Sequence, residues 1–132
     1  MMSKTVLIVE DDSLNMKLLN DLLEFQGYTI IQQNDGLGAY EAICEHRPDL
    51  VLMDIQLPGR SGLDITEAMK SNVELKHIPV IAVTAFTEQQ DKQDCLNHGC
   101  DGYIAKPISI YTFFDTVSEF TKDIKQDLRI VH

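Results

Sequence analysis

Five short apolar runs alternate along the chain with longer segments whose apolar positions recur every three or four residues. Strands that read as continuous apolar runs are buried on both faces, and such strands form parallel sheets covered by helices. The pattern therefore predicts an α/β fold, with a five-stranded parallel sheet and five flanking helices, and we take the strand order to be 2-1-3-4-5, a common order of such doubly wound sheets. The predicted strands are residues 6–9, 29–33, 50–53, 80–83 and 103–105.

Helix signals lie between the first four strands. Asp12 and Ser13 can cap the start of the first helix, and Gly27 can end it in the left-handed backbone region. Further helices are predicted over residues 37–46 and 63–71. One face of the first helix is expected to carry Leu14, Leu18, Leu22 and Phe25.

The last two helices differ in apolar content. The segment TEQQDKQDCLNHG has little apolar surface beyond Cys95 and Leu96, although Thr87 and Gln90 can form a capping box. We therefore expect a fourth helix of low local stability. A strong amphipathic helix is predicted from Ser109 towards Leu128, with a stripe of Ile110, Phe113, Phe114, Val117, Phe120 and Ile124.

Length and charge limit the classes of protein to consider. The 132 residues suit one domain, with a core over about residues 4–121, an extended last helix and tail to 132, and no output domain. A net charge of -10 disfavours nucleic-acid binding. No apolar run approaches the ~20 residues that span a membrane, and no signal-peptide pattern is present, so a cytoplasmic protein is expected. Cys44, Cys95 and Cys100 are interpreted as small buried hydrophobic residues.

Reactive side chains follow four of the predicted strands: Glu10 and Asp11, then Asp54, Thr84 and Lys106. In an open parallel sheet of this order, ligands bind at the carboxyl ends of strands one and three. Carboxylates gathered there repel one another unless a cation neutralises them, and hard oxygen ligands favour Mg²⁺. We therefore expect a site that handles a phosphoryl group, with Asp54 able to form an acyl phosphate.

Four motifs resemble those of response-regulator receiver domains of two-component signalling: LIVEDD, DLVLMDIQLPGRSG, VIAVTAF and GYIAKPIS. The resemblance covers nearly the whole chain and implies a flavodoxin-like receiver fold. Within the family the chain most resembles the single-domain DivK type, through EDDSLNMKLLNDLLEFQGY and HIPVIAVTAF. That type works with histidine kinases in controlling the bacterial cell cycle and polarity. The resemblance thus implies a stand-alone response regulator, not an enzyme in its own right, although receivers assist their own phosphorylation and dephosphorylation.

The resemblance also implies a role for each residue of the acidic cluster. Asp54 is then the phosphoacceptor, and Glu10 and Asp11 bind Mg²⁺ together with Asp54 and the carbonyl of Gln56. Glu10 stands where many receivers have Asp, which is a common variant. Asp12 lies one residue beyond the acidic pair and is interpreted as the cap of the first helix.

Three further residues complete the implied switch. Thr84 is the switch hydroxyl, Lys106 contacts the phosphate, and Tyr103 occupies the aromatic switch position. The Lys106–Pro107 peptide bond is expected to be cis. The implied partners are histidine kinases or phosphotransfer proteins and downstream protein targets, which bind a face formed by the fourth helix, fifth strand and fifth helix. The chain is expected to be a monomer or weak dimer, without nucleic-acid or membrane partners.

Other functions compete with this interpretation. A receiver fold that acts only as a phosphorylation-independent scaffold has the same sequence pattern. A small phosphatase of the haloacid-dehalogenase type also forms an aspartyl phosphate with Mg²⁺, but it needs a second acid two residues after the nucleophile, where this chain has Gln56. A flavodoxin-like or nucleotide-binding module is disfavoured because no glycine-rich phosphate loop follows the first strand.

Overall fold

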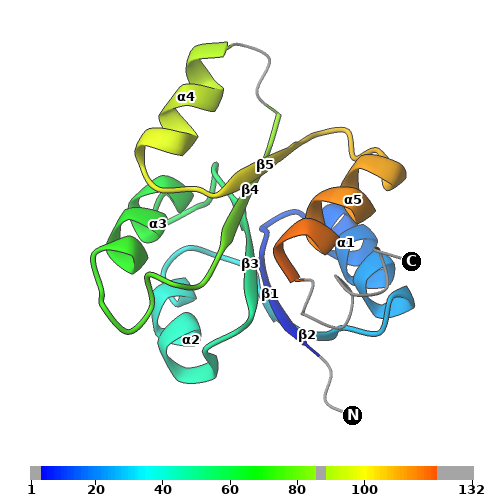
Figure 1. Cartoon of the computed structure of the whole chain (residues 1–132), viewed down its shortest axis with the longest axis horizontal. Helices are drawn as coiled ribbons and strands as arrows, with labels where there is room; N and C mark the ends of the chain where they lie inside the picture. The colour runs from blue at the N-terminus through cyan, green and yellow to red at the C-terminus, as the bar shows by residue number, and fades with distance from the viewer. Residues whose placement is uncertain (1–3, 86–88, 122–132) are drawn as a thin grey trace, which may run out of the picture.

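The computed structural model of the chain describes residues 4–85 and 89–121 and contains a five-stranded sheet in which all paired strands are parallel (Figure 1). The strand order is β2-β1-β3-β4-β5, so the predicted topology is confirmed. Each strand begins and ends within one residue of its predicted bounds. The strands are β1 (Thr5–Val9), β2 (Thr29–Gln33), β3 (Leu50–Asp54), β4 (Val80–Thr84) and β5 (Gly102–Ala105).

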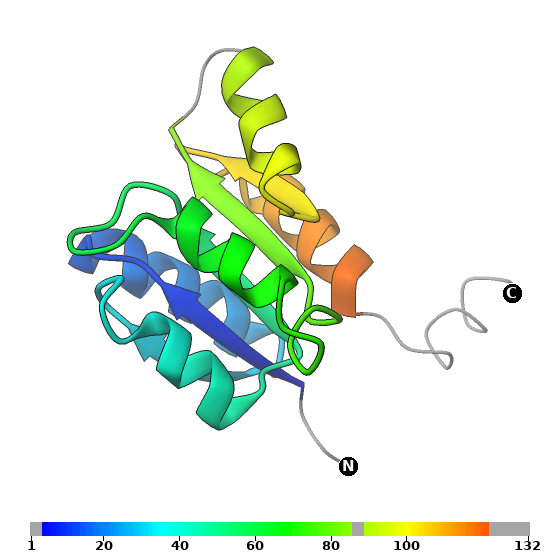
Figure 2. The same ribbon diagram turned by 90° about the vertical axis from the view of Figure 1, so that its left-hand side faces the viewer.

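Helices cover both faces of this sheet. α1 (Ser13–Phe25) and α5 (Ile110–Thr121) lie on one face, whereas α2 (Ala39–His46), α3 (Gly62–Lys70) and α4 (Gln89–Asn97) lie on the other. The view turned by 90° shows α2 and α3 in front of the strands and α1 behind them (Figure 2). Each face has its own apolar core. Every residue of β3 and β4 is buried, as the apolar runs predicted.

The ends of α1 follow the predicted signals. The carboxylate of Asp12 accepts a hydrogen bond of 2.8 Å from the backbone amide of Asn15, which caps the helix start. Gly27 follows the helix with φ of +90°, in the backbone region that glycine adopts without strain.

The expected apolar face of α1 is not the face that packs against the sheet. The helix carries apolar residues on two nearly opposite faces, and the sequence pattern alone does not distinguish them. Leu22 packs at the edge of the core, but the other three residues of the expected face are exposed: Leu14 (78%), Leu18 (39%) and Phe25 (85%). The residues that α1 buries are Met16, Leu19 and Leu23.

The last two helices bear out the predicted contrast as far as the structure describes them. Among the described side chains of α4, Cys95 is buried and Leu96 is 44% exposed. In contrast, α5 buries Phe113 and Val117 in the core that it shares with α1. The expected capping box of Thr87 and Gln90 and the expected continuation of the last helix through Ile124 to Leu128 lie outside the described residues. No helix within the described ranges is long and apolar enough to cross a membrane.

Candidate functional site

The sheet brings the reactive residues to one edge. Val9 of β1 pairs with Met53 of β3, so the residues that follow, Glu10 and Asp54, lie next to each other at the carboxyl ends of the two central strands. On the other side of Asp54, the backbone amide of Lys106 donates a hydrogen bond of 2.8 Å to the carbonyl of Thr84. Residues from four separate strand ends therefore surround one site, as the topology predicted.

Three carboxylates form the acidic part of this site. Glu10, Asp11 and Asp54 each offer an oxygen atom, and these atoms lie within 4.8 Å of one another. Glu10 and Asp54 are buried, with 1% and 4% exposure, whereas Asp11 is exposed. The cluster thus has two buried ligands and one ligand at its mouth. Asp12 is not part of it, because the Asp12 side chain caps α1.

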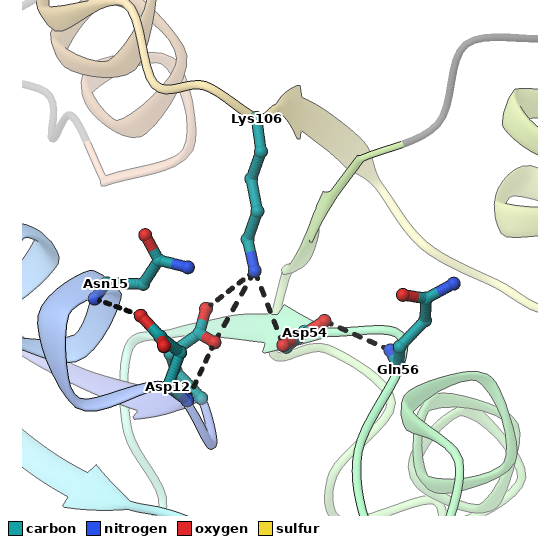
Figure 3. A network of polar contacts seen from close by, with 6 residues as sticks. Asp12, Asn15, Asp54, Gln56 and Lys106 are labelled. Atoms are coloured by element: carbon teal, nitrogen blue, oxygen red, sulfur yellow. Dashed lines mark hydrogen bonds and ion pairs between the residues drawn. The ribbon is translucent and has the colours of Figure 1, made fainter.

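The ammonium of Lys106 lies against two of these carboxylates (Figure 3). Its Nζ atom is 3.1 Å from Oε1 of Glu10 and 3.4 Å from Oδ2 of Asp54. Burial lowers the pKa of Lys106, but the carboxylates of Glu10 and Asp54 outweigh this effect and raise the pKa overall. Lys106 is therefore positively charged at neutral pH and partly neutralises the acidic cluster.

The single positive charge of Lys106 does not neutralise the three carboxylates of the cluster. Burial raises the pKa of Asp54 to about 7, and the neighbouring carboxyl group of Glu10 acts in the same direction. The backbone amide of Gln56, which donates a hydrogen bond of 3.0 Å to Oδ1 of Asp54, and the charge of Lys106 lower the pKa but do not compensate. At neutral pH the site thus has an unfavourable excess of negative charge.

The chemistry of the site fits a bound Mg²⁺ ion. Oε1 of Glu10 is buried and makes no hydrogen bond with any described residue, although Lys106 lies 3.1 Å away as an ion pair. The oxygen-only set of Glu10, Asp11 and Asp54 is the hard-ligand type that Mg²⁺ prefers. A divalent cation there would relieve the repulsion that raises the pKa of Asp54.

The remaining predicted residues lie around the same edge. Thr84 is 1% exposed at the end of β4, and its hydroxyl has no hydrogen-bond partner in the described part of the chain. Tyr103 is 37% exposed on β5, where Nζ of Lys92 on α4 lies 4.8 Å from the centre of its ring. The Lys106–Pro107 peptide bond is cis, as expected.

Three contacts of this region were not predicted from the sequence. The backbone amide of Asp12 donates a hydrogen bond of 3.2 Å to Oε2 of Glu10, and the Gln56 amide binds Asp54 as described above. Both orient a buried carboxylate through main-chain groups. The contact between Lys92 and Tyr103 was also missed, and it joins α4 to β5. None of these contacts has a sequence signature, because any residue supplies a backbone amide and surface lysines are common.

Comparisons with known proteins agree with this geometry. The family model "Response regulator receiver domain" matches residues 6–118. A curated relative, the polar-differentiation response regulator DivK of Brucella anthropi, is 52% identical over 122 residues, which are 92% of this chain and 99% of that protein.

Two solved structures are also similar. One is the receiver domain of a sensor histidine kinase of Pseudomonas aeruginosa with a magnesium ion coordinated in the active site cleft; it has 28% identity and a TM-score of 0.83, over 90% of this chain and 98% of that chain. The other is a co-crystal structure of the Saccharomyces cerevisiae histidine phosphotransfer protein Ypd1 with the receiver domain of its response regulator Ssk1. The similar chain has 26% identity and a TM-score of 0.82, over 89% of this chain and 88% of that chain.

Proposed function

This chain belongs to the response regulator receiver domain family and is a response regulator of the DivK type; we propose that it is a phosphorylation switch in which Asp54 is the phosphoacceptor. The observation that carries this proposal is the meeting of three carboxylates and one lysine at the carboxyl ends of the central strands. No other cluster of this kind occurs among the described residues.

In the proposed reaction, a carboxylate oxygen of Asp54 attacks the phosphorus atom of a phosphohistidine. The N–P bond breaks, the histidine of the donor leaves, and an acyl phosphate remains on Asp54. The Gln56 amide holds Asp54 by a hydrogen bond of 3.0 Å to Oδ1. Lys106, which now pairs with Glu10 and Asp54, supplies a positive charge for the oxygens of the incoming phosphoryl group.

We propose that Glu10, Asp11 and Asp54 bind Mg²⁺, together with the backbone carbonyl of Gln56. The supporting observations are the oxygen-only donor set and the raised pKa of Asp54, since that carboxyl must be ionised to act as a nucleophile. When bound, Mg²⁺ neutralises charge on the carboxylates and on the phosphoryl oxygens. The magnesium in the receiver domain from Pseudomonas aeruginosa supports this assignment by similarity.

The readout is proposed to pass through Thr84 and α4. The buried hydroxyl of Thr84 has no partner among the described residues, so a phosphoryl oxygen on Asp54 would satisfy it. Movement of Thr84 towards the phosphoryl group would alter the contact between Lys92 and Tyr103. This change would in turn alter the surface formed by α4, β5 and α5. This surface would then bind or release downstream proteins.

The partners are proposed from the similarity of this chain to other receiver proteins. We propose that histidine kinases or phosphotransfer proteins donate the phosphoryl group, as the complex of Ypd1 with the Ssk1 receiver domain suggests. The 52% identity to DivK supports a role in cell-cycle or polarity control. We further propose that the receiver domain, with its core at about residues 4–121, acts by protein contacts, as its similarity to DivK suggests.

The test is direct phosphorylation of the purified chain. Wild type and Asp54→Asn would each be incubated with Mg²⁺ and a small acyl-phosphate donor, and the mass of the intact chain would be measured. We expect one added phosphate on wild type, none on Asp54→Asn, and none on wild type when EDTA replaces Mg²⁺. If wild type bound Mg²⁺ but gained no phosphate, the scaffold function would be favoured instead.

A further inference from the structure

The carboxyl end of α4 has a backbone turn that places two cysteines together. Gly99 has φ of +104°, its amide donates a hydrogen bond of 3.0 Å to the carbonyl of Leu96, and the amide of Cys100 donates one of 3.0 Å to the carbonyl of Cys95. These two bonds define a Schellman motif, in which the side chains of the first and last residues frequently pack against each other. Here those residues are Cys95 and Cys100.

The two thiols are neighbours in a closed environment. Cys95 is 1% exposed and Cys100 is 5% exposed, and both belong to the core between the sheet and α2 and α3. The polar neighbours of the Cys100 thiol include the thiol of Cys95 and the hydroxyl of Thr66. Both cysteines are in the thiol form in the structure, and so is the partly exposed Cys44.

The backbone geometry suits a covalent link. A disulfide needs Cα atoms about 4.4–6.8 Å apart and Cβ atoms directed towards each other. A direct backbone hydrogen bond between Cys95 and Cys100 holds their Cα atoms close, and the thiol of Cys95 is a hydrogen-bonding neighbour of the Cys100 thiol. We propose that Cys95 and Cys100 form a redox-active dithiol, which a peroxide oxidises to an intramolecular disulfide.

The proposed reaction balances in two steps. One thiolate attacks a peroxide oxygen, the O–O bond breaks, and a sulfenic acid forms with release of water after protonation. The second thiolate then attacks the sulfenic sulfur, the S–S bond forms, and the hydroxyl leaves as a second water. The two thiols lose two electrons and two protons in total, and hydrogen peroxide is reduced to two molecules of water.

The environment makes this reaction slow in the closed chain. Burial raises the pKa of Cys100 to about 12, and the adjacent Cys95 acts in the same direction, so little thiolate is present at neutral pH. Oxidation therefore requires opening of the end of α4, where Leu96 is already 44% exposed and the apolar contacts are few. Because the thiols react only when the end of α4 opens, their rate of oxidation would report how often this end opens.

The disulfide would fix the end of α4 to the start of β5. Cys100 precedes Asp101, whose carboxylate accepts a hydrogen bond of 2.8 Å from the amide of Val80 and lies 2.9 Å from Nζ of Lys70. The segment before β5 is thus already anchored to β4 and α3. A bond from Cys95 to Cys100 would extend this anchorage to α4. The inference does not depend on phosphorylation of Asp54.

The test uses Cys44→Ser as the parent variant, because it leaves only the two cysteines in question. The purified folded chain would be treated with hydrogen peroxide, quenched, unfolded in guanidinium and exposed to N-ethylmaleimide before its intact mass is measured. We expect the untreated chain to bind two maleimides. Most of the treated chain should bind none, stay monomeric and lose the mass of two hydrogen atoms.

Two outcomes would overturn the proposal. One is a treated chain that still binds two maleimides after exposure to peroxide for longer than the backbone amides at the end of α4 need to exchange with solvent, while a cysteine-containing control peptide is oxidised. The other is loss of thiols through added oxygen or covalent dimers. The matched variants Cys44→Ser/Cys95→Ser and Cys44→Ser/Cys100→Ser retain one thiol each and should not show the intramolecular loss. Circular dichroism would verify that all variants are folded. A failure to form the disulfide could then not be explained by unfolding of the chain.

Discussion

Lys106 and Glu10 are 96 positions apart in the chain, yet Nζ of Lys106 lies 3.1 Å from Oε1 of Glu10. The pair is formed because β1 and β5 end at the same edge of the sheet. Since Lys106 also lies 3.4 Å from Asp54, a single ammonium is shared by two buried carboxylates. The stability of the metal-free chain therefore depends on the positive charge of Lys106, the same charge that would meet the phosphoryl group.

Replacing Lys106 by alanine should destabilise the metal-free chain by about 2 kcal/mol, because two buried carboxylates lose their shared cation. Urea unfolding in EDTA would measure the change, and added Mg²⁺ should recover part of the loss. Lys76→Ala is a matched control, since Lys76 is exposed and its ammonium pairs with no carboxylate in the described part of the chain. Equal stability of the two variants would contradict the expected role of Lys106.

Asp54→Asn should stabilise the metal-free chain above pH 7. The pKa of Asp54 is raised from 3.8 to about 7 by folding, so the folded state binds a proton more tightly than the unfolded state. The stability of wild type therefore falls as pH rises from about 4 to about 7. The asparagine variant has no such fall and should be more stable by about 1 kcal/mol at pH 8. Parallel unfolding curves for the two chains across this pH range would disprove the prediction.

The two neighbouring acids Asp11 and Asp12 should respond differently to the same change. Asp11→Asn should weaken Mg²⁺ binding about tenfold, because it removes a charged ligand from the cluster. Asp12→Asn should leave both Mg²⁺ binding and stability nearly unchanged, since asparagine is as good an N-cap as aspartate. Titration calorimetry would measure both affinities. A larger loss of Mg²⁺ affinity in the Asp12 variant than in the Asp11 variant would show that Asp12, and not Asp11, is the metal ligand.

Thr84→Val should not destabilise the unphosphorylated chain. The Thr84 hydroxyl is buried without a hydrogen-bond partner among the described residues, so its replacement by a methyl group removes an unsatisfied group. Thr66→Val is the matched control, because the buried hydroxyl of Thr66 donates a hydrogen bond of 2.8 Å to the carbonyl of Gly62. That variant should lose about 1 kcal/mol in thermal or urea unfolding. The reverse order of stabilities would show that the Thr84 hydroxyl has a partner in solution.

The sheet and the composition of the acidic cluster were predictable because both depend on position along strands. A continuous apolar run fixes a buried strand, and the residue after it is delivered to the sheet edge whatever the details of packing. Glu10, Asp11 and Asp54 could therefore be grouped before any contact was known. The strand order 2-1-3-4-5 is one of the common orders of doubly wound sheets, and the resemblance to receiver domains, not the periodicity, selected it.

The packing of α1 was not predictable in the same way. Leu14 and Leu18 form as good an apolar row as Leu19 and Leu23, and only the sheet decides which row is covered. Contacts made by backbone amides, such as that of Gln56 with Asp54, were likewise invisible, because the sequence records side chains and not the path of a loop. The sequence thus predicted the elements of the fold from their periodicity, but it did not predict which face of α1 packs against the sheet or which backbone amides contact the site.

The backbone amides of α4 should exchange with solvent faster than those of α1. Cys95 is buried in α4 while Leu96 is 44% exposed, whereas α1 buries Met16, Leu19 and Leu23. Fewer buried contacts give a lower free energy of local opening, and a difference of about 2 kcal/mol corresponds to roughly thirtyfold in exchange rate. Hydrogen exchange followed by mass spectrometry would compare residues 92–97 with residues 16–23. Equal protection of both segments, with or without phosphate on Asp54, would rule out α4 as the mobile element of the proposed switch.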